Sequence, residues 1–457
     1  MSFVFNSPDA IHRVAVTVDS GDCVTYGQLA KLSSQATDAF KPDDLVAIEC
    51  DNSLDSLLAY VGCMQKGVPA LLVEKGLDDS KKAQLYQHYR VSLVNSGGVS
   101  QRLLPCGPAM HPDLAILLST SGSTGSPKLV RLSRFNINSN ARQIATYLGL
   151  DHQSRAITTL PLQYSFGLSI INSHFFVSGS IALTDKSITE RGFWDFFHLA
   201  KPDSFSGVPA TYEMLRRIRF ERMSLPSLKT MTQAGGRLSA ESIEYFANLG
   251  LNKGYEFWVM YGQTEATARM SYLPSSQSLS KSDSIGIPIP DGRFEIIDSD
   301  GYRIDCAGQV GELVYYGPNV MMGYATDATD LARGDTQNGR LCTGDLAEFD
   351  VDGYFYIRGR LKRFLKLFGN RINLDEVEKD LQKEGLNVYV SGKDDQLLIV
   401  GTDNNEVERA SIDFCSRFRF HPSAVKVMVL EQIPRNDSGK IQYAKILDLF
   451  ESKVSTS

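Results

Sequence analysis

A polar, glycine-rich segment with a single lysine, STSGSTGSPKL at 119–129, follows an apolar run and carries the first residues suited to chemistry. Gly122 and Gly125 allow the backbone to turn sharply and to approach an anion closely, while the serine and threonine hydroxyls can donate hydrogen bonds. Lys128 adds a positive charge beside them. Because a flexible linker has no reason to follow a buried strand directly, we interpret this segment as a phosphate-binding loop.

The residues around Lys128 exclude two common kinds of phosphate loop. A Walker A loop has a glycine directly before its lysine and a serine or threonine directly after it. Here Pro127 precedes Lys128 and Leu129 follows it. Proline also lacks the N–H that a helix N-terminus would offer to a phosphate. The dinucleotide-binding G-x-G-x-x-G pattern is absent from the segment as well, so the loop belongs to another class.

Three further motifs follow this phosphate loop in order along the chain. They are YGQTEAT at 261–267, CTGD continuing to NLDEVE at 342–378, and IPRNDSGKIQ at 433–442. Together with the loop they resemble the signatures of the adenylate-forming, AMP-binding superfamily, which contains acyl-CoA synthetases, the adenylation domains of peptide synthetases, and luciferases. The first hundred residues match this family only faintly, in TYGQLA.

The resemblance implies ATP-dependent activation of a small-molecule carboxylic acid in two half-reactions. The carboxylate attacks the α-phosphate of ATP to give an acyl-adenylate and pyrophosphate, and a thiol then displaces AMP. We expect an AMP-forming acid–thiol ligase that uses ATP, Mg²⁺ and coenzyme A. One alternative is a stand-alone enzyme that loads an acyl or aminoacyl group onto the phosphopantetheine of an acyl or peptidyl carrier protein. A second alternative, a non-catalytic nucleotide-binding regulatory protein, is disfavoured because the family's catalytic residue types are all present.

The resemblance also assigns residues to the nucleotide. The β- and γ-phosphates are expected to bind Thr120, Ser121, Gly122, Ser123, Thr124, Gly125 and Lys128. Thr264 supplies a phosphate-contacting hydroxyl and Glu265 a carboxylate for Mg²⁺, which needs few protein ligands when it bridges phosphates. The adenine is expected to lie against Gly235, Gly236 and Tyr261, and the ribose hydroxyls to bind Asp345, with Arg360 contacting ribose or phosphate.

The C-terminal motifs supply the remaining catalytic expectations. Lys440 matches the family's catalytic lysine, which bridges the carboxylate and the α-phosphate during adenylation; the long stem and compact charge of lysine suit that reach. Lys362 falls at the family's hinge, where the small domain rotates between the half-reactions. Gly369 falls where pantetheine passes close to the backbone.

The predicted acid pocket includes Tyr164, Ser165 and Arg269. Tyr164 stands where many acyl and aryl ligases have histidine. Ser165 stands where amino-acid-activating domains have an aspartate that pairs with the α-ammonium, which argues against an ordinary α-amino acid because a buried ammonium needs a partner. Arg269 aligns with a pocket position. It pairs either with a second anionic group on the substrate or with a structural carboxylate, and the sequence leaves both readings open.

The strands and helices that must position these residues can be predicted from the sequence pattern. Short apolar runs alternate with amphipathic stretches along the chain. Strands are predicted at 45–50, 70–75, 114–120, 156–162, 180–184, 228–234 and 257–262. Helices are predicted at 25–40, 53–67, 138–149, 209–220 and 239–250. The alternation predicts an α/β fold whose N-terminal domain has mixed, mostly parallel sheets with packed helices.

From about residue 291 the strands become short and punctuated by glycine, which predicts a small β-region. The segment beyond it mixes helix and strand patterns over a length that suffices for a small domain. We therefore expect an adenylation domain at 1–361 and a mobile α+β domain at 362–457 that carries Lys440.

Composition narrows the class of protein. The chain has 457 residues, 42% of them hydrophobic and 22% charged, and a net charge of −6, which argues against nucleic acid as a partner. Its seven cysteines form no CxxC pair, and we see neither a signal peptide nor an apolar run long enough to span a bilayer. We expect a cytoplasmic protein without a membrane partner, and the sequence leaves monomer and homodimer open.

Overall fold

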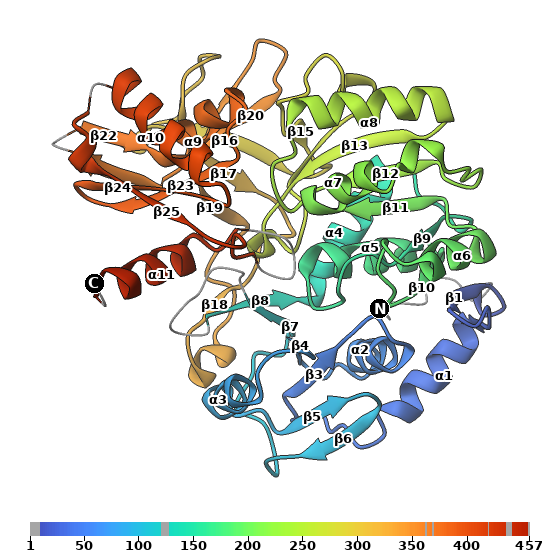
Figure 1. The fold of residues 1–457 in the computed structure, drawn as a ribbon. Helices are drawn as coiled ribbons and strands as arrows, with labels where there is room; N and C mark the ends of the chain where they lie inside the picture. Colours follow the sequence, from blue (N-terminus) through green and yellow to red (C-terminus); the bar gives the residue numbers. More distant parts are fainter. Residues whose placement is uncertain are drawn as a thin grey trace. The chain divides into compact units, whose positions relative to one another are not determined.

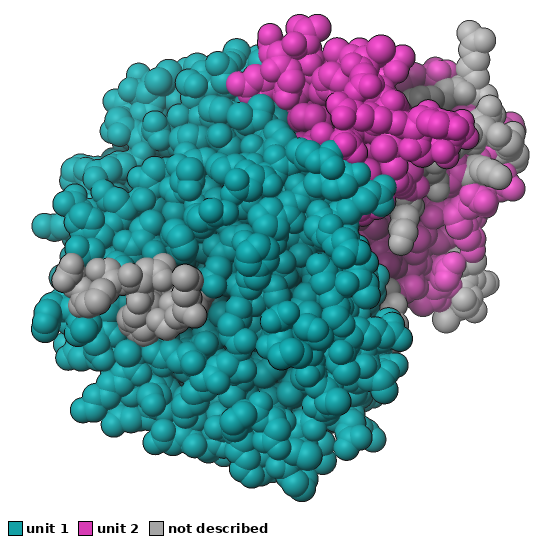
Figure 2. Space-filling model, turned by 180° about the vertical axis from the view of Figure 1, so that it is seen from behind, with its two compact units in different colours: residues 1–293, 315–341 teal, residues 294–314, 342–457 magenta. Residues whose placement is uncertain are grey.

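The computed structural model describes residues 10–119, 128–361, 363–367, 370–418, 420–435 and 441–455. The chain divides into two compact units (Figure 2). Unit 1 contains residues 1–293 and 315–341, and unit 2 contains residues 294–314 and 342–457. The predicted α/β class is confirmed, since both units combine helices with sheets. The predicted domain boundary at residue 362 stays a prediction, because compactness does not identify the pivot of a moving domain.

Unit 1 contains a nine-stranded sheet in the order β15-β14-β13-β12-β11-β9-β10-β1-β2. Its strands are β1 (Val14–Val18), β2 (Cys23–Thr25), β9 (Arg155–Ile157), β10 (Ser180–Leu183), β11 (Ser204–Gly207), β12 (Thr230–Gln233), β13 (Glu256–Tyr261), β14 (Ser271–Leu273) and β15 (Ile287–Pro288). The run from β13 to β1 is parallel, and β2, β14 and β15 pair antiparallel at the edges. The associated helices are α6 (Arg191–Ala200), α7 (Pro209–Arg217) and α8 (Ala240–Lys253), and Figure 1 shows α7 and α8 beside β11, β12 and β13.

A second, seven-stranded sheet of unit 1 has the order β18-β8-β7-β4-β3-β5-β6. Its strands are β3 (Val46–Cys50), β4 (Ala70–Glu74), β5 (Leu93–Ser96), β6 (Val99–Arg102), β7 (Leu114–Ser119), β8 (Leu129–Ser133) and β18 (Gly323–Ala325). The helices of this part are α1 (Tyr26–Ala36), α2 (Leu54–Lys66), α3 (Asp79–Tyr89), α4 (Arg134–Tyr147) and α5 (Ser165–Phe176). One hydrophobic core joins residues of both sheets with residues of α2, α4 and α5.

Local sequence signals explain where several of these helices begin and end. Thr25 and Gln28 form a capping box at α1, and Ser133 and Asn136 form another at α4. The helix α2 ends at Gly67, whose left-handed backbone glycine adopts without strain. These caps satisfy backbone groups that a helix end leaves unpaired.

Unit 2 contains smaller sheets. A four-stranded sheet has the order β16 (Arg293–Ile297), β17 (Gly311–Tyr316), β19 (Arg340–Phe349) and β20 (Phe355–Arg360), which matches the predicted β-region. A hairpin follows, formed by β21 (Phe364–Leu367) and β22 (Asn370–Asn373). The last sheet is β23 (Val388–Lys393), β24 (Gln396–Gly401) and β25 (Val425–Val429), and the helices are α9 (Leu374–Lys383), α10 (Asn404–Phe418) and α11 (Tyr443–Ser455). No helix of the described residues is long and apolar enough to cross a membrane.

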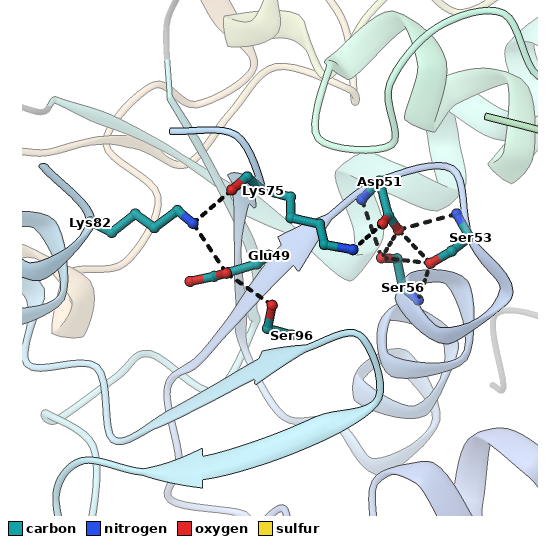
Figure 3. Close-up of polar contacts among 7 residues, drawn as sticks. All are labelled: Glu49, Asp51, Ser53, Ser56, Lys75, Lys82 and Ser96. Carbon is teal, nitrogen blue, oxygen red and sulfur yellow. Dashed lines mark hydrogen bonds and ion pairs between the residues drawn. The ribbon is translucent and has the colours of Figure 1, made fainter. Parts of the chain in front are cut away.

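A polar cluster holds the loops after β3 and β4 together (Figure 3). Glu49 accepts hydrogen bonds from Lys82 at 3.2 Å and from Ser96 at 2.9 Å. Asp51 accepts from Lys75 at 2.5 Å, and also from Ser53 and Ser56. Partial burial raises the pKa of Asp51, but these hydrogen bonds outweigh it and bring the pKa to about 2. The charges are matched within the cluster, so we assign it a structural role.

The helix α5 contains a buried histidine with one ring nitrogen that has no hydrogen-bond partner among the described residues. His174 Nδ1 donates to the carbonyl oxygen of Ile170 at 2.8 Å, and its Nε2 is buried with no partner among the described residues. Burial lowers the pKa of His174 to about 4, because the imidazolium would have to form away from water. Below its unfolded pKa of about 6.5, the unfolded chain therefore binds a proton that the folded chain does not.

We predict that the free energy of unfolding falls by about 2 kcal/mol between pH 7 and pH 5, because His174 takes up a proton only in the unfolded chain. The pKa of Asp51 is depressed to about 2, so its contribution is lost only below its unfolded value of about 3.9 and does not interfere in this range. The measurement is urea unfolding of the wild type and of His174→Gln at both pH values. The variant should lose about 2 kcal/mol less than the wild type, and an equal loss in both proteins would contradict the prediction.

Candidate active site

The predicted nucleotide residues of unit 1 follow the carboxyl ends of its strands. β7 ends at Ser119, directly before the phosphate loop, and β8 begins directly after Lys128. Gly235 follows β12, and β13 ends at Tyr261; these two strands are parallel neighbours. Loops after the carboxyl ends of parallel strands are where ligands bind in open α/β sheets. Several predicted residues lie outside the described residues, namely Thr120, Ser121, Gly122, Ser123, Thr124, Gly125, Lys362, Gly369 and Lys440.

Tyr324 connects the lysine of the phosphate loop to the predicted metal carboxylate. The Lys128 ammonium lies over the Tyr324 ring, 3.1 Å from its centroid. The Tyr324 hydroxyl donates to Glu265 Oε1 at 2.9 Å, and burial raises the pKa of Tyr324, so the phenol keeps the proton that it donates. Pairing of β18 with β8 places Tyr324 opposite Val130. Sequence reasoning missed Tyr324 because only this pairing of distant segments brings it beside Lys128.

The loop at 261–269 holds Thr264 and Glu265 in a tight, strained conformation. A Cβ on Gly262 would lie 1.7 Å from the carbonyl oxygen of Ala268, so no larger residue fits there. Thr267 is β-branched yet has a φ of +65°, a backbone state that costs roughly 1–3 kcal/mol. The Thr267 hydroxyl donates to the carbonyl of Asn319 at 2.7 Å, which helps to hold this conformation. Strain of this kind is typical of functional loops.

Two predicted acid-pocket residues contact predicted nucleotide residues. The hydroxyls of Ser165 and Thr264 lie 3.2 Å apart. A Cβ on Gly235, whose φ is +83°, would lie 2.4 Å from the Tyr164 hydroxyl. Burial raises the pKa of Tyr164 to about 12, although the nearby Arg269 lowers it in part. The structure therefore brings residues of unit 1 that are predicted to bind the phosphates, the adenine and the acid into one neighbourhood.

Side-chain hydrogen bonds from Gln233 stabilise the turn that contains Gly235 and Gly236. Gln233 Nε2 donates to the carbonyl of Gly236 at 2.8 Å and to that of Ala234 at 3.3 Å. Tyr261, at the end of the adjacent strand, accepts a hydrogen bond from Gln263 at 3.3 Å. These contacts fix the backbone of the expected adenine site through side chains that sequence reasoning did not single out.

The remaining nucleotide candidates, Asp345 and Arg360, lie in unit 2 on neighbouring strands. They face each other in the pairing of β19 with β20, and Arg360 Nε donates to Asp345 Oδ1 at 3.1 Å. The Asp345 side chain is almost fully buried, whereas that of Arg360 is 61% exposed. The amide of Arg360 donates to Asp375 Oδ2 at 3.0 Å, which anchors the strand end. The arginine side chain therefore keeps most of its surface open to a ligand.

The donor set suits a cation that binds mainly to phosphate. The described residues contain no group of three or more histidine, cysteine, aspartate or glutamate side chains that could hold a metal ion. Mg²⁺ in nucleotide sites keeps several waters and takes one or two carboxylates besides the phosphate oxygens. Glu265, fixed by Tyr324, fits that requirement.

Comparison with known proteins adds a family match and named relatives. Residues 98–325 match the family described as AMP-binding enzyme. The long-chain-fatty-acid–CoA ligase of Escherichia coli O157:H7 is 28% identical over 401 residues, which cover 82% of this chain and 66% of that protein. This chain thus spans slightly less than two thirds of that relative. The anthranilate–CoA ligase of Pseudomonas aeruginosa is 27% identical over 496 residues, covering 96% of this chain and 93% of that protein.

A solved structure extends the comparison to the fold. O-succinylbenzoate coenzyme A synthetase from Bacillus subtilis, in complex with AMP, superimposes with a TM-score of 0.77 at 23% identity, covering 95% of each chain. The same synthetase in complex with ATP and magnesium ion gives a TM-score of 0.76 at 22% identity, covering 95% of this chain and 97% of that one. At this identity the likeness shows the fold of the whole chain.

We predict that Gly235→Ala weakens AMP binding at least about tenfold, since the added methyl group meets the Tyr164 hydroxyl and the positive φ costs roughly 1 kcal/mol or more. Gly236→Ala is the matched control. It lacks the positive φ, and its nearest neighbour would be Pro209 Cγ at 3.1 Å, so its effect should be smaller. Adding Tyr164→Phe to Gly235→Ala should recover part of the loss. Isothermal titration with AMP measures all three, and equal losses for the two alanine variants would contradict the prediction.

Proposed function

Because the chain belongs to the adenylate-forming, AMP-binding superfamily, we propose that it is an AMP-forming acid–thiol ligase. It activates a carboxylic acid with ATP, releases pyrophosphate, and transfers the acyl group from AMP to coenzyme A. The observation that carries the proposal is the contact of Tyr324 with both Lys128 and Glu265, which ties the phosphate loop to the YGQTE motif. The names of the curated relatives, both acid–CoA ligases, support coenzyme A as the thiol.

The first half-reaction brings the anionic carboxylate against the anionic triphosphate, so positive charge and fixed donors must surround them. Lys128 and the Thr264 hydroxyl would stabilise the negative charge of the leaving pyrophosphate, and their contacts with Tyr324 and Ser165 support this proposal. Tyr324 orients both Lys128 and Glu265 before a nucleotide binds. Glu265 would hold Mg²⁺, which neutralises charge on the phosphate oxygens when it is bound. Preorganised groups of this kind need not reorganise during the reaction.

The motifs of unit 2 support the remaining roles. Asp345 would accept hydrogen bonds from the ribose hydroxyls, with Arg360 beside it. Lys440 would bridge the attacking carboxylate and the α-phosphate, at the end of the triphosphate opposite Lys128. We further propose that residues 362–457 pivot about Lys362 between the half-reactions, and that pantetheine passes Gly369. The support is the match of GRLKRFLKLFGNRI to the family's hinge pattern.

Product analysis tests the proposal directly. The protein is incubated with ATP, Mg²⁺ and a panel of aliphatic, aryl, hydroxy and amino acids, with and without coenzyme A. We expect AMP and pyrophosphate in equal amounts, together with an acyl-CoA thioester when coenzyme A is present. Formation of ADP would show a phosphotransferase and contradict the proposal. Pyrophosphate release without transfer to coenzyme A would favour a carrier-protein phosphopantetheine as the acceptor.

We predict that Lys440→Ala lowers ATP–pyrophosphate exchange by about 10²–10³-fold, equivalent to roughly 3–4 kcal/mol of transition-state stabilisation. Thioester formation from synthetic acyl-adenylate and coenzyme A should persist. That step begins after the carboxylate has attacked the α-phosphate, so it does not need the charge that Lys440 supplies to the attack. Lys445→Ala removes an exposed lysine of α11 and serves as the matched control. Exchange that survives in Lys440→Ala at the level of the control would overturn the role of Lys440.

A further inference from the structure

Two arginine side chains of unit 1 are buried, and they differ in what surrounds the guanidinium. Arg131, on β8, is 1% exposed. Its guanidinium donates to four backbone carbonyls, at Tyr324, Met322, Gly334 and Arg333. These carbonyls use the donors of Arg131 to hold β18 and the segment after it against β8. Arg131 is therefore a structural arginine that makes four hydrogen bonds within the protein.

Arg269 is buried to the same degree but lacks such partners. It is 3% exposed, and its Nε is buried with no hydrogen-bond partner among the described residues. The guanidinium has a side-chain hydrogen bond with Tyr147, and the Arg269 carbonyl accepts from Asn319 Nδ2 at 2.9 Å and from Asn140 Nδ2 at 3.1 Å. The backbone is thus fixed in place while the guanidinium keeps an unused donor.

The surroundings of the Arg269 guanidinium are aromatic and neutral. It stacks on Phe166, 3.7 Å from the ring centroid. Its polar neighbours are Tyr147 and Tyr164, and burial raises the pKa of each phenol to about 12, so both are uncharged near neutral pH. Within the described residues no carboxylate forms an ion pair with Arg269. Within the described residues no structural carboxylate accounts for Arg269, which favours the other reading that the sequence left open, a second anionic group on the substrate.

Such an arrangement is costly unless a negative charge completes it. Burying an ion without a counter-ion costs more free energy than contact with an aromatic face returns. The guanidinium offers a planar fork that matches a carboxylate with two parallel hydrogen bonds. An enclosed, unpaired guanidinium on a fixed backbone is therefore preorganised for an anion.

The position of Arg269 identifies the anion as part of the acid substrate. Phe166, on which it stacks, follows Ser165, and the Ser165 hydroxyl lies 3.2 Å from that of Thr264. Tyr164, its other neighbour, lies against the Gly235 turn. The guanidinium thus shares its neighbours with the groups expected to hold the nucleotide and the reacting carboxylate, which places it on the acid side of that site.

We propose that Arg269 is a specificity-determining residue that binds a second carboxylate of the substrate, so that the enzyme activates dicarboxylic acids. This inference rests on the proposed function. An acid without the second carboxylate would leave the buried guanidinium unpaired, and sites built around a buried polar partner reject analogues that lack the matching group by large factors. The apolar walls that enclose the charge exclude water, which cannot then substitute for the missing carboxylate.

The test compares acids of equal chain length with one or two carboxylates, for example butyrate with succinate and benzoate with phthalate. The readout is kcat/KM for pyrophosphate release by the full chain with ATP and Mg²⁺. For the wild type we expect at least a 100-fold preference for the dicarboxylic member of the best pair. Arg269→Gln should reduce that preference to less than about fivefold, mainly through a higher KM for the diacid, and Arg269→Lys should restore part of it.

Arg131→Gln is the matched control, because it removes a guanidinium that is equally buried. It should lower the melting temperature and leave the ratio of diacid to monoacid unchanged. If Arg269→Gln fails to fold, the wild-type ratio still decides the question, together with the rise in melting temperature that diacid and monoacid each produce in the presence of AMP.

Each outcome separates the inference from the proposed function. A wild type that releases pyrophosphate with monocarboxylic acids as well as with their dicarboxylic partners would overturn the inference and leave the proposed function standing. Equal losses for both acids in Arg269→Gln would assign the guanidinium to the reacting carboxylate and also overturn it. Absence of AMP and pyrophosphate with every acid would count against the proposed function itself, and with it against the inference.

Discussion

The ring of Tyr324 is the point at which the two opposite charges of the candidate site are held. The Lys128 ammonium lies over the face of the ring, and the Tyr324 hydroxyl donates a hydrogen bond to Glu265. One neutral side chain thus sets the distance between Lys128 and the YGQTE motif. This placement depends on the antiparallel pairing of β18 with β8. It depends equally on Arg131, whose guanidinium clamps the carbonyls on both sides of that strand. A buried structural arginine thereby supports the candidate site.

The charges of the site differ from those elsewhere in unit 1. In the cluster at the ends of β3 and β4, each charge is matched: Glu49 meets Lys82 and Asp51 meets Lys75. Around the candidate site, by contrast, the buried Arg269 stacks on Phe166 and pairs with no carboxylate of the described residues. A cation that is held by an aromatic ring instead of a carboxylate keeps its positive potential for an incoming anion. This is the electrostatic condition that adenylation of an acid requires.

Several backbone positions of the candidate site are strained or tightly packed. Thr267 has a positive φ, Gly262 has no room for a Cβ, and Gly235 combines a positive φ with close contact to Tyr164. Side-chain hydrogen bonds from outside support these loops: Asn319 Nδ2 donates to the carbonyls of Ala266 and Arg269, and Gln233 Nε2 donates to that of Gly236. Rigid support of this kind keeps catalytic groups within the narrow geometry that their chemistry needs.

The sequence by itself determined the class of fold and the kind of site, because both depend on local pattern. The alternation of apolar runs and amphipathic stretches predicted the parallel strands of unit 1 to within a residue or two at most positions, and motif order predicted the family. The elements that it missed include the strands β1, β5, β8 and β11 and the helices α3, α5 and α6. The helix α5 was not predicted because it is buried on every side and so lacks an apolar stripe. The strand predicted at 156–162 ends at Ile157. The next residue, Thr158, donates its N–H to the carbonyl of Ala182 and its hydroxyl to that of Thr184. Only the tertiary structure decided the roles of Tyr324 and Arg269, because the first depends on which strand lies beside β8, and the second on which charges are missing around a buried guanidinium.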